Sequence, residues 1–258
     1  MKKDPFVKVD SHAHITSDEL YPNVDGIIER ACAAGVTQII NINTDRITLE
    51  RALKLKEKYP AQVFNTVSTT PHDVEKEGES NFAYFEKIIR EKKVVAVGEV
   101  GLDYHYEHSN RDIQKEFLNR YFDLAMDVSL PVVIHCRGDK AFEDLYAFPQ
   151  NIKAVMHCFT GNLYQAEAAL ERGWYISISG IATFKKGEAL SAVIKEVPLD
   201  RLLIETDSPY LAPQSKRGQM NEPANIGEVA DTIANLKNVS IEEVCNQTTK
   251  NSKYFFNI

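Results

Sequence analysis

The chain has 258 residues, 43% of them apolar, and a net charge of −7, so it can bury a sizeable core. An acidic chain lacks the broad basic face that coats DNA, although a local pocket could still take one nucleic-acid end. No apolar run approaches the ~20 residues of a membrane span, and no apolar segment follows the basic N-terminal residues. We therefore expect a cytoplasmic protein with no secretory signal and no membrane partner. The cysteines, Cys32, Cys136, Cys158 and Cys245, have no CxxC spacing and indicate reduced thiols.

Short β-rich runs alternate with longer amphipathic stretches along the whole chain. A helix is expected at 24–35, and two more near 225–237 and 240–254. Within residues 113–130, a stripe at helical spacing predicts a face packed on a sheet. That stripe comprises Phe117, Tyr121, Leu124 and Val128. The expected strands cover residues 6–12, 36–43, 62–68, 94–100, 131–136, 153–158, 174–179 and 201–206.

Eight strands, each followed by a helix, are typical of an α/β protein with a (β/α)8 TIM barrel. A doubly wound open sheet is the alternative, but no GxGxxG follows a strand. The sequence contains no internal repeat, low-complexity tract or obvious linker. It therefore predicts a single domain over residues 1–258.

Side chains that can bind metals gather at the ends of the predicted strands, where barrel enzymes place their active sites. A single buried histidine is more often a hydrogen-bonded core residue than a ligand, and a single carboxylate can cap a turn. The joint arrangement is harder to explain in that way. In addition, Glu99 follows an apolar run, and an unpaired carboxylate there would be costly to desolvate. His12 and His14 share one face because alternate strand residues point the same way. The full set is His12, His14, Glu99, His135, His157, Glu205 and Asp207.

This inventory exceeds what one catalytic ion normally takes from protein, which is about three ligands. Two ions ~3.5–4 Å apart and bridged by a carboxylate fit it better. Glu99 is the expected bridge, because it comes from the middle of the barrel. Such ions lower the pKa of bound water, and Asp207 could ligate one ion and take the proton of that water. The residues predict metal-assisted hydrolysis, and their mixed nitrogen and oxygen donors suit Zn²⁺, Mn²⁺, Fe²⁺ or Ni²⁺.

The cysteines beside two of these histidines are not expected to bind metal. Cys136 and Cys158 follow His135 and His157, so strand alternation should turn both thiols toward the outer helices. We expect them to pack there.

Phosphate could be held by cations at the barrel mouth, since barrels often bind it with the loops after strands seven and eight. Those loops carry Lys185, Lys186 and Arg217, which could focus a phosphate into the site of an acidic protein. A solvated charge pair is the alternative and is about as well supported for Lys186. Arg137 lies two positions after His135 on the same strand face and is the better candidate for phosphate.

Seven segments resemble, in chain order, the signature segments of TatD-type metal-dependent deoxyribonucleases. The resemblance covers nearly the whole chain and implies a TIM barrel of the amidohydrolase-like superfamily, with phosphodiesterase activity supported by Mg²⁺ or Mn²⁺. It also implies one ion on His12, His14, Glu99 and Asp207, and a second ion on Glu99, His135 and His157. The segments are DSHAH (10–14), GEVGLDYHY (98–106), VIHCR (133–137), MHCFTG (156–161), ISISG (176–180), ETDSPYLAP (205–213) and NEP (221–223).

The chain departs from this family pattern in two loops. The family loop after strand three reads Gly-x-His-Pro-His, whereas this chain has Ser68 and Thr70 at its first and third positions. His72, in a polar loop, keeps the last position and is a candidate substrate contact. Before the Asn-Glu-Pro segment, Gln219 and Met220 replace basic residues. All the expected metal ligands are present, so the departures concern substrate range.

Three functions remain as hypotheses. The first is a nuclease that trims DNA ends or short single strands, with no obligate protein partner. The second is a small-molecule amidohydrolase or phosphoesterase on the same scaffold. Amidohydrolases typically bridge their ions with a carboxylated lysine, and Glu99 stands at that place, which favours the phosphodiesterase. The third is a catalytically silent metal-binding partner, which the retention of every ligand type disfavours.

Overall fold

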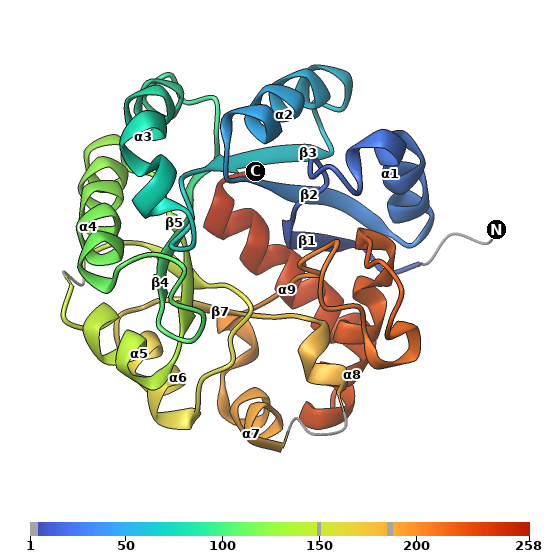
Figure 1. The fold of residues 1–258 in the computed structure, drawn as a ribbon. Coiled ribbons are helices and arrows are strands. Elements are labelled where there is room, and N and C mark those ends of the chain that lie inside the picture. The colour runs from blue at the N-terminus through green and yellow to red at the C-terminus, as the bar shows by residue number, and fades with distance from the viewer. Residues whose placement is uncertain (1–4, 149–150, 185–187) are drawn as a thin grey trace.

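A computed structural model describes residues 5–148, 151–184 and 188–258. Its eight strands form one sheet in the order β1-β2-β3-β4-β5-β6-β7-β8, and each neighbouring pair is parallel (Figure 1). The strands are β1 (Lys8–Ala13), β2 (Val36–Asn43), β3 (Val63–Val67), β4 (Ala96–Asp103), β5 (Val132–Arg137), β6 (Ala154–Met156), β7 (Tyr175–Ile178) and β8 (Leu202–Ile204).

The first and last strands meet and nearly close the sheet into a barrel. Ala13 forms a parallel bridge with Ser208, and the backbone N–H of His14 donates to the Ser208 carbonyl at 2.7 Å. The Asp207 N–H donates to the His12 carbonyl at 2.9 Å. The TIM-barrel prediction is confirmed. The doubly wound alternative is wrong, because an open sheet would leave its two outer strands apart.

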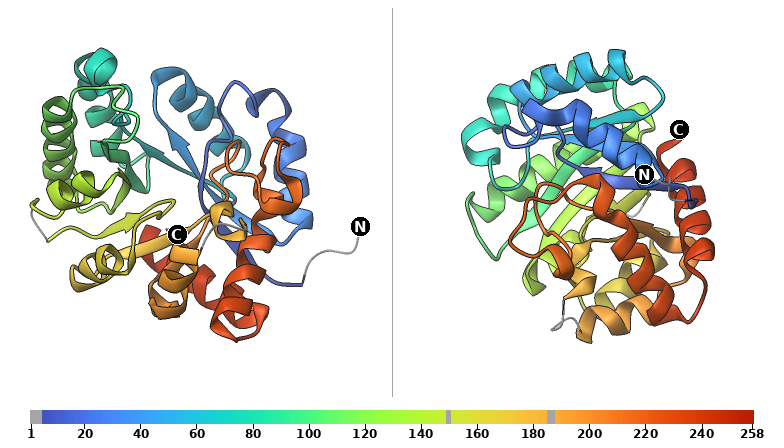
Figure 2. Two further views of the ribbon diagram at one scale, coloured as in Figure 1. Left: turned by 60° about the horizontal axis from the view of Figure 1, so that its bottom comes forward. Right: turned by 90° about the vertical axis from the view of Figure 1, so that its right-hand side faces the viewer.

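Helices follow the strands and surround the barrel (Figure 2). Polar caps fix several of their ends: Asp45 and Thr48 form a capping box at the start of α2, and Asn162 and Gln165 form one at the start of α6. Among the described residues, none of the helices combines the length and the apolar character needed to cross a bilayer. The helices are α1 (Val24–Ala33), α2 (Arg46–Lys58), α3 (Val74–Arg90), α4 (Arg111–Val128), α5 (Asp139–Leu145), α6 (Leu163–Glu171), α7 (Glu188–Glu196), α8 (Ile226–Lys237) and α9 (Ile241–Phe256).

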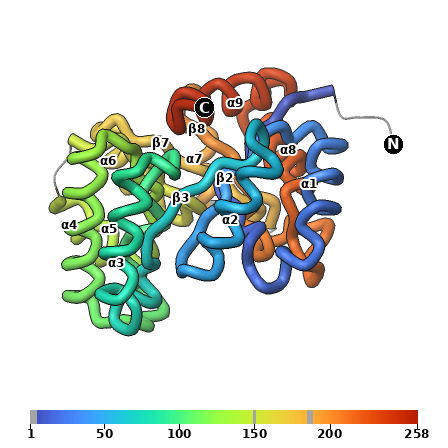
Figure 3. Tube along the Cα trace, turned by 90° about the horizontal axis from the view of Figure 1, so that it is seen from above, coloured from blue at the N-terminus to red at the C-terminus, as the bar shows by residue number. Residues whose placement is uncertain are grey.

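Two separate apolar clusters hold these layers together. The larger one lies between the strands and the surrounding helices. It includes Phe117, Tyr121 and Leu124 of the predicted α4 stripe, and Val128 packs against it. The smaller one fills the barrel with inward strand residues such as Val133, Val155 and Leu203, together with Phe255 and Phe256 of α9. Helix α9 thus closes one end of the barrel (Figures 1 and 3). The opposite end, toward which the strands run, is open to a cavity lined by predicted metal ligands.

Two strands end two residues earlier than the sequence predicts. β6 ends at Met156 and β8 at Ile204, where 153–158 and 201–206 were expected. His157, Glu205 and Asp207 therefore lie in the first residues of the loops that leave the barrel. Because these strands end early, strand alternation does not fix the direction of the side chains that follow, such as Cys158.

Candidate metal centre

A cavity of about 820 Å³ opens at the end of the barrel toward which the strands run. His14, Glu99, His135, His157 and Asp207 line it. His12 lies directly beneath, fully buried and stacked on the His157 ring with centroids 3.9 Å apart. The structure thus brings all six predicted metal ligands together at one point.

Four donor atoms form a first group. His12 Nε2 lies 3.3 Å from His14 Nε2, 3.4 Å from Glu99 Oε2 and 3.6 Å from Asp207 Oδ1. His14 Nε2 lies 3.7 Å from Glu99 Oε2 and 3.5 Å from Asp207 Oδ1. Ligand atoms at the corners of a tetrahedron with bonds of about 2.0–2.2 Å stand about 3.3–3.6 Å apart. The first group therefore has the spacing that suits a tetrahedral divalent ion.

Three donor atoms form a second group around the other oxygen of the same carboxylate. Glu99 Oε1 lies 2.9 Å from His135 Nδ1 and 3.0 Å from His157 Nε2, and these two nitrogens are 3.2 Å apart. Ligands at right angles with bonds of about 2.1 Å stand about 3.0 Å apart. Three such atoms occupy one face of an octahedral arrangement, which would leave other positions for water or substrate. Both histidine–Glu99 groups can hold an ion by this geometry.

Glu99 reaches this place because β4 is irregular. Val97 packs outward in the larger apolar cluster, so plain alternation would also turn Glu99 outward. The register with β5 shifts between Val97 and Val100, and such an irregularity re-aims the side chains that follow it. Gly101 lets the two strands approach closely here: a Cβ on it would stand 1.8 Å from the His135 carbonyl oxygen.

The histidines and carboxylates polarise one another. Burial alone would raise the pKa of Glu99, but the charge of His157 and hydrogen bonds from His12, His135 and His157 hold that pKa well below its usual value. Burial opposes the charge on Asp207 as well, and contacts with His14, His12 and His157 lower its pKa. Both carboxylates are therefore ready to bind a cation at neutral pH.

Asp103, at the end of β4, orients one of the predicted ligands. Its Oδ1 accepts the backbone N–H groups of His105 and Tyr106 at 3.0 and 2.8 Å, which fixes the carboxylate. Its Oδ2 lies 2.9 Å from His135 Nε2. Because a carboxylate only accepts, His135 donates from Nε2 to Asp103, and its Nδ1 is the nitrogen that would bind an ion beside Glu99. His72 Nε2 lies 3.6 Å from the same oxygen, so the predicted substrate residue His72 borders this group.

The expectation for Cys158 is wrong, whereas that for Cys136 is confirmed. Cys136 is buried in the apolar cluster between strands and helices, and it also borders the cavity. Cys158 follows the end of β6 with a φ of 44°, so strand alternation no longer applies to it. Its thiol lies 3.2 Å from the Ser179 hydroxyl, and the residue lines the cavity. Burial raises the pKa of this thiol well above its usual value, so it remains uncharged at neutral pH.

The predicted phosphate-binding cations have different surroundings. Arg137 lines the cavity, and its guanidinium lies over the Tyr106 ring, 4.7 Å from the centroid. Arg217 is exposed and lies over the ring of Phe184, another lining residue, also at 4.7 Å. Lys185 and Lys186 fall outside the described residues.

Asn221 of the Asn-Glu-Pro segment fixes the loop that carries Asp207. Its Nδ2 donates to the carbonyls of Thr206 and Tyr210, each at 2.8 Å. Its Oδ1 accepts the N–H of Glu222 and the amide of Asn225, each at 3.0 Å. Sequence reasoning gave neither Asn221 nor Asp103 a role. The available signals were the position of Asn221 in the NEP segment and that of Asp103 at the end of GEVGLD.

Comparisons with known proteins agree with this fold and with a metal-dependent hydrolase. The family model of the TatD related DNases matches residues 9–257. YabD of Bacillus subtilis, named an uncharacterized metal-dependent hydrolase, is 38% identical and aligns over 96% of this chain and 98% of its own length. A protein of Erwinia tasmaniensis named 3′-5′ ssDNA/RNA exonuclease TatD is 31% identical, over 96% of this chain and 99% of its own.

A solved structure supports the same assignment. The crystal structure of YJJV, a TatD homologue from Escherichia coli K12, matches with a TM-score of 0.89 and 29% identity, covering 97% of this chain and 98% of that one. The scaffold is that of a metal-dependent hydrolase, and the structure adds the candidate groups of histidines and carboxylates for the metal. The chain therefore belongs to the TatD-related DNase family of metal-dependent hydrolases.

Proposed function

We propose that this protein is a divalent-metal-dependent deoxyribonuclease that trims DNA ends by hydrolysing phosphodiesters at a two-ion site. The observation that carries the proposal is the Glu99 carboxylate, whose two oxygens each face a different group of donor atoms. A carboxylate so placed suits a bridge between two ions, one with His12, His14 and Asp207 and one with His135 and His157. Two divalent ions at these positions would supply Lewis acidity and neutralise charge on the phosphodiester.

The surrounding residues supply the other requirements of the reaction. Asp207, ionised at neutral pH, is the group we assign to accept the proton of the attacking water. Arg137, braced against Tyr106, is assigned to a phosphate oxygen. Asp103 holds His135 in the tautomer that presents Nδ1.

The walls of the cavity favour a nucleic-acid substrate. Tyr106, Tyr210 and Phe184 line it, and the two tyrosines are 53% and 54% exposed. Tyr106 follows β4 and Tyr210 follows β8, which lie across the barrel from each other. Exposed aromatic rings on both sides of a phosphate site suit stacking with the bases of a single strand. Relatives named as 3′-5′ ssDNA/RNA exonucleases agree with single-stranded ends, and they extend the proposal to RNA ends.

The test measures cleavage of single-stranded DNA labelled at either end, with chelator-treated protein and after addition of Mg²⁺ or Mn²⁺. We expect stepwise shortening only with added metal. Glu99→Gln should lower the rate more than about 100-fold, because each of the two donor groups loses a charged ligand. Glu29→Gln, at an exposed carboxylate on α1, is the matched control.

Other outcomes would contradict the proposal. Equal cleavage in the presence of chelator, or none with any divalent ion, would exclude a metal-dependent nuclease. Faster turnover of cyclic amides or mononucleotides than of DNA would favour the small-molecule hydrolase. Metal binding without turnover of any of these substrates would favour the catalytically silent protein.

A further inference from the structure

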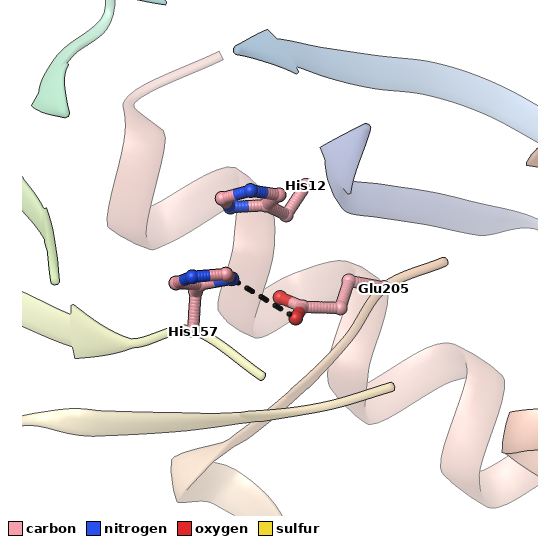
Figure 4. Close-up of side chains that lie close together, drawn as sticks. All are labelled: His12, His157 and Glu205. Atoms are coloured by element: carbon pink, nitrogen blue, oxygen red, sulfur yellow. Dashed lines mark ion pairs between the residues drawn. The ribbon is translucent and has the colours of Figure 1, made fainter. Parts of the chain in front are cut away.

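Three polar atoms beneath the two donor groups are buried and lack a hydrogen-bond partner among the described residues: His12 Nδ1, His157 Nδ1 and Glu205 Oε2. The three residues lie together, because one potential ligand atom of each is within 4.8 Å of the other two. Figure 4 shows the two stacked imidazole rings with the Glu205 carboxylate beside them. Buried polar atoms normally have partners, so this group needs a physical explanation.

The position of Glu205 is fixed by the last strand. Leu203 of β8 points into the barrel, and Glu205, two residues later, continues on that side. The residue is 0% exposed. Its Oε1 accepts the Cys158 backbone N–H at 2.6 Å and lies 3.4 Å from His157 Nδ1, while Oε2 has an unused acceptor site.

The tautomers of the two rings supply the missing donors. His12 and His157 both direct Nε2 toward Glu99. A neutral imidazole whose Nε2 lone pair binds an ion carries its hydrogen on Nδ1. Each Nδ1–H then needs an acceptor, and metal-bound histidines commonly donate this hydrogen to a carboxylate.

We propose that Glu205 is a positioning residue that accepts the Nδ1–H groups of both His12 and His157. This inference rests on the two-ion site proposed above. His12 belongs to the first donor group and His157 to the second, so one carboxylate orients a ligand at each ion position. Asp103 offers a contrast, because His135 of the second group is the one ligand of the six that it contacts.

The test compares Glu205→Gln with Asp103→Asn by titrating Zn²⁺ into chelator-free protein against a chromophoric competitor. The glutamine can still accept the Cys158 N–H through its oxygen, but its NH₂ group meets an Nδ1–H, which forces at least one ring out of the ligating tautomer. We expect Glu205→Gln to weaken Zn²⁺ binding about 10–100-fold at both positions. Asp103→Asn should weaken one position by a similar factor and leave the other within about twofold of wild type.

A second measurement needs no variant of Glu205. Nitrogen-15 NMR of the histidine rings in the Zn²⁺-loaded wild-type protein reports which ring nitrogen carries hydrogen. Peaks are assigned with His12→Gln and His157→Gln. We expect the Nδ1–H tautomer for both rings in the wild type and a mixture of tautomers in Glu205→Gln.

Three results would overturn the proposal. They are unchanged Zn²⁺ affinity at both positions in a folded Glu205→Gln protein, weakening confined to one position, or an Nε2–H tautomer of either ring in the wild type. If Glu205→Gln does not fold, the wild-type spectrum decides alone. None of these readouts depends on phosphodiester cleavage, so a failure of the nuclease proposal would be recognised separately by the DNA assay.

Discussion

Replacing Gly101 with alanine tests the close contact that positions Glu99 and His135. The new Cβ would stand 1.8 Å from the His135 carbonyl oxygen, at a residue with a φ of 153°. A carbon–oxygen contact needs about 3.3 Å, so the strands must separate by about 1.5 Å. Overpacking of this kind costs about 1–3 kcal/mol and the backbone strain about 1–2 kcal/mol, which predicts a loss of about 2–5 kcal/mol in unfolding free energy.

The assay is urea denaturation of chelator-treated protein, together with DNA cleavage after metal is added. A shift of about 1 Å between Glu99 and His135 should lower the cleavage rate about 100-fold. Gly173→Ala is the matched control, because its φ of 72° imposes the strain while no described atom lies within 4 Å of the new Cβ. If the two variants were equally stable and active, the close approach of β4 and β5 would not matter and the reasoning would be refuted.

Three further predictions concern the loop, the walls and the charges of the site. Asn221→Leu removes four hydrogen bonds at similar volume and should cost about 2–4 kcal/mol, measured by urea denaturation; a loss below about 0.5 kcal/mol would contradict its role in fixing the loop. Tyr106→Ala should raise KM for single-stranded DNA at least about fivefold more than KM for an abasic single strand of the same length, which keeps the phosphates but has no base to stack. Tyr164→Ala, at an exposed tyrosine of α6 that does not line the cavity, should change neither. Burial alone would lower the pKa of His157, but the charge of Glu99 and hydrogen bonds to acidic neighbours raise it well above its usual value. The stabilisation from protonated His157 is fully present below the unfolded pKa of about 6.5 and is lost as pH rises through the folded pKa. The Tm of chelated protein should therefore fall more steeply above pH 6.5 in wild type than in Glu99→Gln. Equal slopes would contradict this pairing of His157 with Glu99.

The sequence was sufficient for the barrel and for the gathering of the six ligands. Each ligand lies at or near the end of a predicted strand, and the ends of parallel strands meet at one rim, so the sequence pattern predicts their proximity. The direction of individual side chains was less predictable. Alternation from Val97 sends Glu99 the wrong way until the irregularity of β4 is known. Alternation also failed for Cys158, because β6 ends two residues before it.

The partners of the ligands depend on information that no single segment contains. Whether a histidine presents Nδ1 or Nε2 is decided by the carboxylate on its other side. Asp103 contacts His135, and Glu205 contacts His157 from the loop that follows β8. Such pairings follow from packing between distant strands, and the sequence pattern does not specify them.

The nearly closed junction between β1 and β8 has a consequence for how the protein matures. His12 and His14 leave the ribosome early, whereas Asp207 follows His12 by 195 residues and comes from the last strand to join. A growing chain therefore lacks one of the four donors of the first group until the barrel is complete. Binding of an ion by all four donors requires that synthesis has passed β8 and that both ends of the sheet have met, so full coordination at the first group would mark the closed barrel.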